Sequence, residues 1–203
     1  MTISDCRHWI FDMDGTLTVA AHDFDAIRTA LGIKIGTPIL EAIDAMPEQQ
    51  AAVKMQQLND MEMEIAGSSK PQPGAHALLD HLRSQKCSVG ILTRNGCDIA
   101  LATLKAAGLL NYFKKESILG RESCTPKPDP AGITLHLKQW SAKTSETAMV
   151  GDYRFDLEAG FRAGVKTVHL DVDNAEQWPE ITTLRVSGLQ ELTELLQPQT
   201  LQL

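Results

Sequence analysis

Hydrophobic positions change their spacing twice along the first third of this 203-residue chain. The apolar-rich run Arg7–Phe11 stops abruptly at Asp12, where polar residues and Gly15 end the strand pattern. This pattern predicts a buried strand that delivers carboxylates to a loop. From about Phe24 to Gly67 the apolar spacing becomes helical, and strand-like runs are absent there.

The helical stretch contains its own stop and start signals. Pro38 and Pro47 fall where first helical turns are expected, because proline is tolerated at a helix start. The segment Gly67–Gly74 is rich in residues that break regular structure. We therefore expect a helical insertion between two hinges.

After Gly74 the chain alternates between amphipathic and strand-like runs. This alternation predicts a parallel sheet with helices on both faces, which is an α/β fold. The expected helices are Ala75–Ser84, Asp98–Ala107, Pro130–Gln139, Phe155–Ala163 and Leu189–Leu196. The expected strands are Ser88–Leu92, Ser117–Leu119, Ala148–Val150 and Lys166–Leu170, with a short apolar segment at Thr183–Val186.

Composition narrows the functional classes. The formal net charge is -7 and the cations are scattered, whereas nucleic acid binding needs clustered cations, so we expect no nucleic acid partner. No apolar run is long enough for a signal segment or for a membrane span, which predicts a cytoplasmic protein with no membrane partner. The four cysteines are widely separated without a CxxC pair, which favours reduced thiols.

Polar side chains follow the predicted strands, at the sheet edge where α/β proteins bind ligands. They are Asp12, Asp14, Thr93, Lys127, Asp152 and Asp156. Carboxylates two positions apart at a strand end repel one another unless a cation lies nearby, and such oxygen-rich clusters suit Mg²⁺. A single Asp-x-Asp is more often a helix cap or a solvated loop, so the argument depends on the combination.

The sequence resembles the haloacid dehalogenase superfamily. The resemblance rests on four segments that match that family's motifs in its order: Phe11–Leu17, Thr93, Lys127–Pro130 and Gly151–Asp156. It implies a Rossmann-like parallel-sheet core with a small all-helical cap inserted after the first strand, as in the phosphoglycolate phosphatase and β-phosphoglucomutase branch. The expected core spans residues 1–17 and 73–203, and the expected cap spans 18–72.

The resemblance also implies a role for each matching residue. Asp12 attacks phosphorus and binds Mg²⁺, while Asp14 moves the protons and offers its backbone carbonyl to the metal. Thr93 and Lys127 stabilise charge on the transferring phosphoryl group.

Two further groups of residues are implied less directly. Asp152 is a metal ligand, and Asp156 either belongs to the metal site from an outer position or orients Lys127. Gly15, Arg94 and Asn95 are expected near the phosphate. Arg94 departs from the family pattern, because many relatives place Asn directly after the motif threonine. It is expected to bind phosphate or a substrate carboxylate, or to face solvent.

The implied function is a Mg²⁺-dependent phosphatase acting on a small phosphorylated metabolite. The cap looks short for the branch, which leaves the substrate open; His22, Arg28 and Lys34 are candidates to contact it, although each is more typical of an exposed helix. A monomer or weak homodimer is expected.

Three other activities and one non-enzymatic role compete with this function. A β-phosphoglucomutase-like phosphotransferase shares all four motifs and remains the main alternative. A dehalogenase lacks the second aspartate, so Asp14 argues against it. A phosphonatase needs a cap lysine, and Lys34 and Lys54 have no motif around them. A non-catalytic binding module of the same fold is the remaining alternative.

Overall fold

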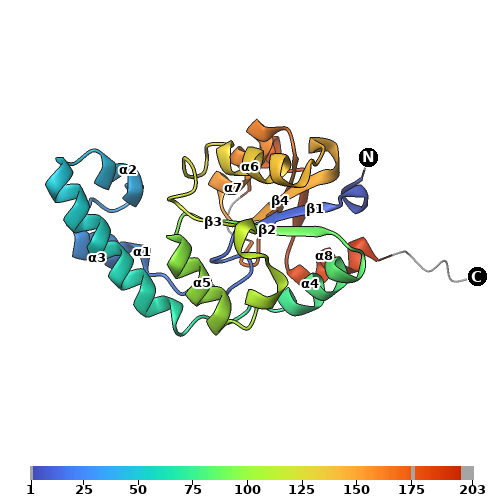
Figure 1. Ribbon diagram of the computed structural model, residues 1–203, viewed down its shortest axis with the longest axis horizontal. Helices are drawn as coiled ribbons and strands as arrows, with labels where there is room; N and C mark the ends of the chain where they lie inside the picture. Colours follow the sequence, from blue (N-terminus) through green and yellow to red (C-terminus); the bar gives the residue numbers. More distant parts are fainter. Residues whose placement is uncertain (1, 175–176, 198–203) are drawn as a thin grey trace, which may run out of the picture.

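Six parallel strands form the centre of the molecule in the computed structural model, which describes residues 2–174 and 177–197. Their order across the sheet is β3-β2-β1-β4-β5-β6, so β1 lies in the interior of the sheet (Figure 1). The strands are β1 His8–Phe11, β2 Ser88–Leu92, β3 Ile118–Leu119, β4 Thr147–Gly151, β5 Lys166–Leu170 and β6 Leu184–Val186. This arrangement confirms the predicted α/β fold.

Helices cover both faces of the sheet because both faces of its strands are apolar. Trp9 and Phe11 point to one face, where they join the core beneath α4 (Ala75–Ser84), α5 (Cys97–Ala106) and α8 (Leu189–Leu196). Ile10 points to the other face and packs under α6 (Ala131–Trp140) and α7 (Arg154–Ala163). Figure 1 shows these two helical layers above and below the strands.

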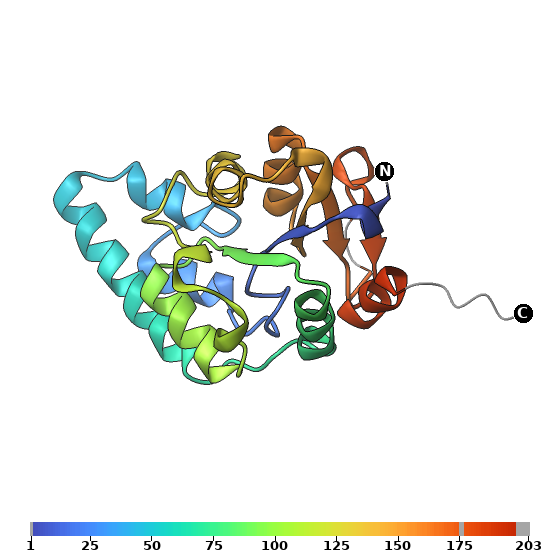
Figure 2. The ribbon, with the colours of Figure 1, turned by 45° about the vertical axis from the view of Figure 1, so that its right-hand side comes forward.

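The stretch between β1 and α4 is helical, as its spacing predicts. It contains α1 Phe24–Leu31, α2 Ile39–Asp44 and α3 Glu48–Ala66, which enclose a separate apolar cluster around Ile43 and Leu58. Pro38 and Pro47 each stand one residue before a helix. Both views place α3 alongside α5, with the three helices beyond the carboxyl end of β1 (Figures 1 and 2). The division into core and cap at residues 17/18 and 72/73 stays a prediction.

The chain leaves and re-enters the sheet region through two adjacent segments. Thr18 and Pro71 form an antiparallel bridge, and the flanking backbone bonds are Val19 N to Lys70 O at 3.0 Å and Gln72 N to Leu17 O at 2.8 Å. We call this pairing of residues 17–19 with 70–72 the waist. It holds the two ends of the helical insertion side by side.

The observed element bounds shift by one residue at several ends. The helix expected at Asp98–Ala107 is Cys97–Ala106, and the strand expected at Ala148–Val150 is one residue longer at each end. The short apolar segment before α8 is the edge strand β6. Short 3₁₀ turns occupy Ile3–Asp5, Leu110–Tyr112, Lys115–Ser117, Thr144–Glu146 and Pro179–Ile181. Within the described ranges, no helix combines the length and apolarity that a membrane crossing requires.

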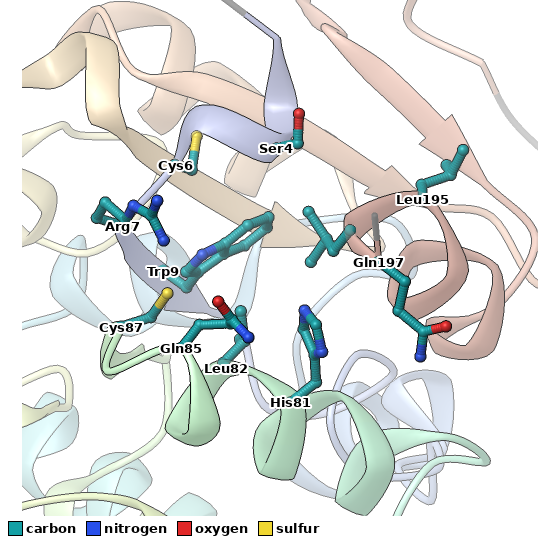
Figure 3. A pocket seen from close by; sticks show the side chains of 11 residues that line it. Ser4, Cys6, Arg7, Trp9, His81, Leu82, Gln85, Cys87, Leu195 and Gln197 are labelled. Atoms are coloured by element: carbon teal, nitrogen blue, oxygen red, sulfur yellow. The ribbon is translucent and has the colours of Figure 1, made fainter. Parts of the chain in front are cut away.

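A cavity of about 470 Å³ lies at the amino ends of β1 and β2, bordered by α4 and α8 (Figure 3). Cys6 and Cys87 line it around the buried Trp9, and both cysteines are free thiols. Burial raises the pKa of both thiols, so they are protonated at neutral pH. This cavity is at the opposite end of the strands from Asp12 and Asp152.

Candidate active site

The loop after β1 is shaped by a tight turn around Met13. The backbone NH groups of Leu17 and Thr18 both donate to the Met13 carbonyl at 2.9 Å, and Gly15 adopts φ +84°. A Cβ at Gly15 would lie 2.4 Å from the Asp152 carboxylate. Gly15 therefore lets two acidic loops approach each other, since this φ and this space both exclude a side chain.

Lys127 connects these loops as a buried cation. Its Nζ lies 2.6 Å from Asp12 Oδ1 and 2.5 Å from Asp156 Oδ1, and only 2 % of its side chain is exposed. Burial alone lowers the pKa of Lys127, but the attraction of Asp12 and Asp156 outweighs that effect and raises it. The ammonium group therefore stays charged beside Asp12.

Three carboxylates gather around this lysine. Asp12, Asp152 and Asp156 each offer an oxygen within 4.8 Å of the others. Burial, and then repulsion from Asp12, raise the pKa of Asp152 to about 7. Such crowding of buried anions fits a divalent cation, and oxygen-only donors are those that Mg²⁺ prefers.

Asp156 occupies a different position from its two neighbours. Its Oδ1 is paired with Lys127, and its Oδ2 accepts a hydrogen bond from the Tyr153 backbone NH at 3.1 Å. The side chain is 1 % exposed. With both oxygens engaged, Asp156 is better placed to orient Lys127 than to bind a metal directly, which is one of the two roles expected for it.

Asp14 is not one of the three clustered carboxylates and has its own set of contacts. Its carboxylate accepts from Asn95 Nδ2 at 2.7 Å and lies 3.4 Å from the Thr18 hydroxyl and 3.8 Å from His22 Nδ1. Burial, followed by the charge of Asp12, raises the pKa of Asp14 to about 7. A carboxyl group with this pKa exchanges protons readily at neutral pH, which suits an acid–base residue.

The second motif supplies a buried hydroxyl. Thr93 follows β2, and its backbone NH continues the sheet by donating to Leu119 O at 3.0 Å. Its Oγ1 accepts from the Asn95 backbone NH at 3.1 Å, which leaves the hydroxyl proton available to a ligand. Asn95 itself holds Asp14, so the structure gives it a positioning contact that the sequence did not predict.

Arg94 forms an ion pair that sequence reasoning missed. Its Nη2 lies 2.8 and 2.7 Å from the two carboxylate oxygens of Glu41 in α2, and its Nη1 donates to the Lys127 carbonyl. The guanidinium also lies 4.9 Å from the centre of the Phe155 ring. Arg94 thus neither faces solvent freely nor presents an unpaired charge. Its expected contact with phosphate stays a prediction.

A cavity of about 350 Å³ opens between this site and the helical insertion. Of the three insertion residues proposed as substrate contacts, Arg28 lines the cavity, the His22 side chain is buried beside Asp14, and Lys34 is exposed. Glu62 of α3 also lines the cavity and pairs with Arg121. No local sequence pattern marks that pair, because it depends on how α3 docks.

These features define an α/β enzyme with an aspartate–lysine centre at the carboxyl ends of its strands. The family model described as haloacid dehalogenase-like hydrolase matches residues 25–170. The chain belongs to the haloacid dehalogenase-like hydrolase family, and the family membership and hydrolase class predicted from the four motifs are confirmed.

Known proteins support this assignment. A haloacid dehalogenase-like hydrolase domain-containing protein of Arabidopsis thaliana is 32 % identical over 91 % of this chain and 77 % of its own. A phosphoglycolate phosphatase of Cereibacter sphaeroides is 28 % identical over 77 % of this chain and 81 % of its own. The crystal structure of a hydrolase from Pseudomonas syringae aligns with a TM-score of 0.78 at 23 % identity, covering 94 % of this chain and 97 % of that one.

Proposed function

We propose that this protein is a Mg²⁺-dependent phosphatase that hydrolyses a small phosphomonoester through an aspartyl-phosphate on Asp12. The observation that carries the proposal is the buried Lys127, held 2.6 Å from Asp12 in a cluster of carboxylates. Relatives named phosphoglycolate phosphatase and putative pyrophosphatase agree with phosphorus chemistry.

In the first step, an Asp12 oxygen bonds to phosphorus and the phosphorus–oxygen bond to the alcohol breaks. The departing alkoxide takes the proton of Asp14, whose raised pKa keeps a protonated fraction available near neutrality. Lys127 and the Thr93 hydroxyl stabilise the negative charge that is spread over the phosphoryl oxygens.

In the second step, water attacks the aspartyl-phosphate. Asp14 now accepts the proton of that water, phosphate leaves, and Asp12 returns to its free carboxylate. Asn95 holds Asp14 in place for both transfers through its 2.7 Å hydrogen bond.

Asp12, Asp152 and the backbone carbonyl of Asp14 would hold the metal ion, with Asp156 behind them. When bound, Mg²⁺ supplies positive charge that offsets repulsion between the carboxylates and the phosphoryl group. The clustered carboxylates fit that ion because they lie within 4.8 Å of one another and are crowded around a single lysine.

The test is phosphate release from a panel of phosphorylated metabolites, including phosphoglycolate and sugar phosphates, with Mg²⁺ or with EDTA. Wild type is compared with Asp12→Asn and with Asp98→Asn, an exposed aspartate at the start of α5. Release should need both the metal and Asp12 and should persist in Asp98→Asn. Isomerised sugar phosphate without phosphate release would instead identify a mutase, and no reaction with any compound would favour a binding module.

The position of the nucleophile can be checked separately. Beryllium fluoride mimics a phosphoryl group on a carboxylate and should be found bonded to Asp12 in a crystal structure of the Mg²⁺ complex. Density bonded to another residue would contradict the assignment.

A further inference from the structure

We infer that the substrate's leaving alcohol carries no second negative charge, and that Glu41 is the specificity-determining residue that sets this preference by occupying Arg94. The inference rests on the proposed function, because it concerns the group that departs from phosphorus. It follows from how the charges that line the 350 Å³ cavity are paired.

Three cationic side chains line this cavity among the described residues: Arg28, Arg94 and Lys127. Lys127 already forms ion pairs with the proposed nucleophile Asp12 and with Asp156. Arg28 donates to the Thr37 carbonyl at 2.9 Å and to Asp25 at 2.7 Å. Arg94 directly follows Thr93 and donates to the Lys127 carbonyl, so it is the cation of the three that lies beside the reacting groups without holding the nucleophile itself.

Arg94 is held on three sides. Arg94 Nη2 donates to both carboxylate oxygens of Glu41, and Nη1 donates to the Lys127 carbonyl. The Phe155 ring lies against the face of the guanidinium group. This two-oxygen geometry is the one that a substrate carboxylate would adopt on arginine. The Glu41 carboxylate, which is not among the residues that line the cavity, therefore already makes with Arg94 the contact that a substrate anion would need.

The rest of the cavity offers an anion no replacement for Arg94. Much of the wall away from the nucleophile is apolar and includes Phe24, Ile39, Leu40 and Leu58. Glu62 adds a carboxylate that is already paired with Arg121. A second substrate anion would lose its hydration and gain no unpaired cation from the described residues that line the cavity, which disfavours binding.

The Glu41–Arg94 pair is accessible enough to be changed without disturbing the core. The Glu41 side chain is 50 % exposed and that of Arg94 is 21 % exposed. Glu41→Gln keeps the size of the side chain and removes its charge, which leaves the Arg94 guanidinium free to bind an anion. The expected shift in preference toward an anionic substrate is about twofold to fivefold, as for partly exposed charge pairs.

The experiment compares phosphoglycolate with the phosphate ester of glycolamide, which has a similar shape without the carboxylate charge. The ratio of kcat/KM for the two compounds is measured for wild type, for Glu41→Gln and for Glu48→Gln, an exposed glutamate at the start of α3. Wild type and Glu48→Gln should prefer the amide, and Glu41→Gln should shift toward phosphoglycolate. The double variant Glu41→Gln/Arg94→Gln should reverse that shift.

A wild-type preference for phosphoglycolate, an unchanged ratio in Glu41→Gln, or a shift that persists without Arg94 would overturn the inference. If neither compound is hydrolysed but other members of the phosphate-release panel are, the proposed function stands, and it fails only if no compound of the panel releases phosphate. The inference is then decided by calorimetric binding of both compounds, since the ratio of their Kd values should move in the same direction.

Discussion

Two glycines that both have a positive φ have different surroundings. Gly15 at φ +84° faces the Asp152 carboxylate, whereas Gly32 at φ +70° ends α1 in open space, with no atom within 4 Å of where a Cβ would lie. A comparison of the two glycines therefore distinguishes the strain of a positive φ from a collision with the acidic cluster. Gly15 lies where the site needs space, and Gly32 lies where the helix needs only a left-handed turn.

Gly32→Ala should lower the free energy of unfolding by about 1 kcal/mol, because this position requires a left-handed backbone, and Gly15→Ala should lower it by at least as much, because its methyl group would also collide with Asp152. Gly15→Ala should in addition lose most phosphate release, since its methyl group would displace Asp152. Urea unfolding and phosphate release measure the two effects. Equal activity in the two variants would show that Asp152 can move without consequence.

A buried histidine makes stability depend on pH. His136 is fully buried, lies 3.0 Å from the Ile91 carbonyl through Nε2 and stacks on Trp140. Burial lowers its pKa from 6.5 to about 4 in the folded protein. Below pH 6.5 the unfolded chain gains a proton that the folded chain resists, so this contribution to stability falls as pH falls toward 4.

His136→Gln should therefore reduce the loss of stability between pH 6.5 and pH 5 by on the order of 2 kcal/mol. The matched control is His76→Gln, because His76 is exposed. Urea unfolding at both pH values gives the difference. The same pH dependence in all three proteins would contradict the assignment to His136.

At the scale of elements, two ion pairs connect the helical insertion to loops at the sheet edge. Glu41 of α2 reaches Arg94 after β2, and Glu62 of α3 reaches Arg121 after β3. They differ in burial, since both side chains of the Glu62–Arg121 pair are 7 % exposed while Glu41 is half exposed. One member of each pair, Arg94 and Glu62, lines the cavity, whereas Glu41 is exposed to solvent and Arg121 is buried where α3 docks.

Glu62→Gln should lower the free energy of unfolding by about 3 kcal/mol, because it leaves the Arg121 charge buried without its partner. Glu41→Gln should cost less than about 1 kcal/mol, as is usual for exposed pairs. Urea unfolding of the two variants compares them directly. Similar losses would mean that burial does not distinguish the two pairs.

At the scale of the whole molecule, metal binding and folding should be linked. Mg²⁺ at about one hundred times its Kd should raise the free energy of unfolding by about 2.7 kcal/mol, since it binds only the folded site. Asp152→Asn should lose this increase and should raise the Tm measured in EDTA, because it removes one of the crowded carboxylates. Thermal unfolding with Mg²⁺ or EDTA measures both effects, and a Mg²⁺ response retained in Asp152→Asn would place the ion elsewhere.

The fold and the centre of the site were predictable because they depend on local patterns joined by one rule of topology. Asp12, Thr93 and Asp152 each follow a strand, and parallel strands bring their carboxyl ends to one edge. The pairs Glu41–Arg94 and Glu62–Arg121 were not predictable, because each depends on the docking angle of α2 or α3. No spacing along the chain encodes that angle.

The waist has a consequence for how such a protein can diversify. Because residues 17–19 and 70–72 are already paired, the insertion begins and ends at neighbouring points, so its length is not constrained by the sheet. Helices can be added, lost or exchanged beyond this junction while the register of β1 with β2 and β4 is unchanged. The residues at the sheet edge and the helices of the insertion can therefore evolve independently, although one gene encodes both.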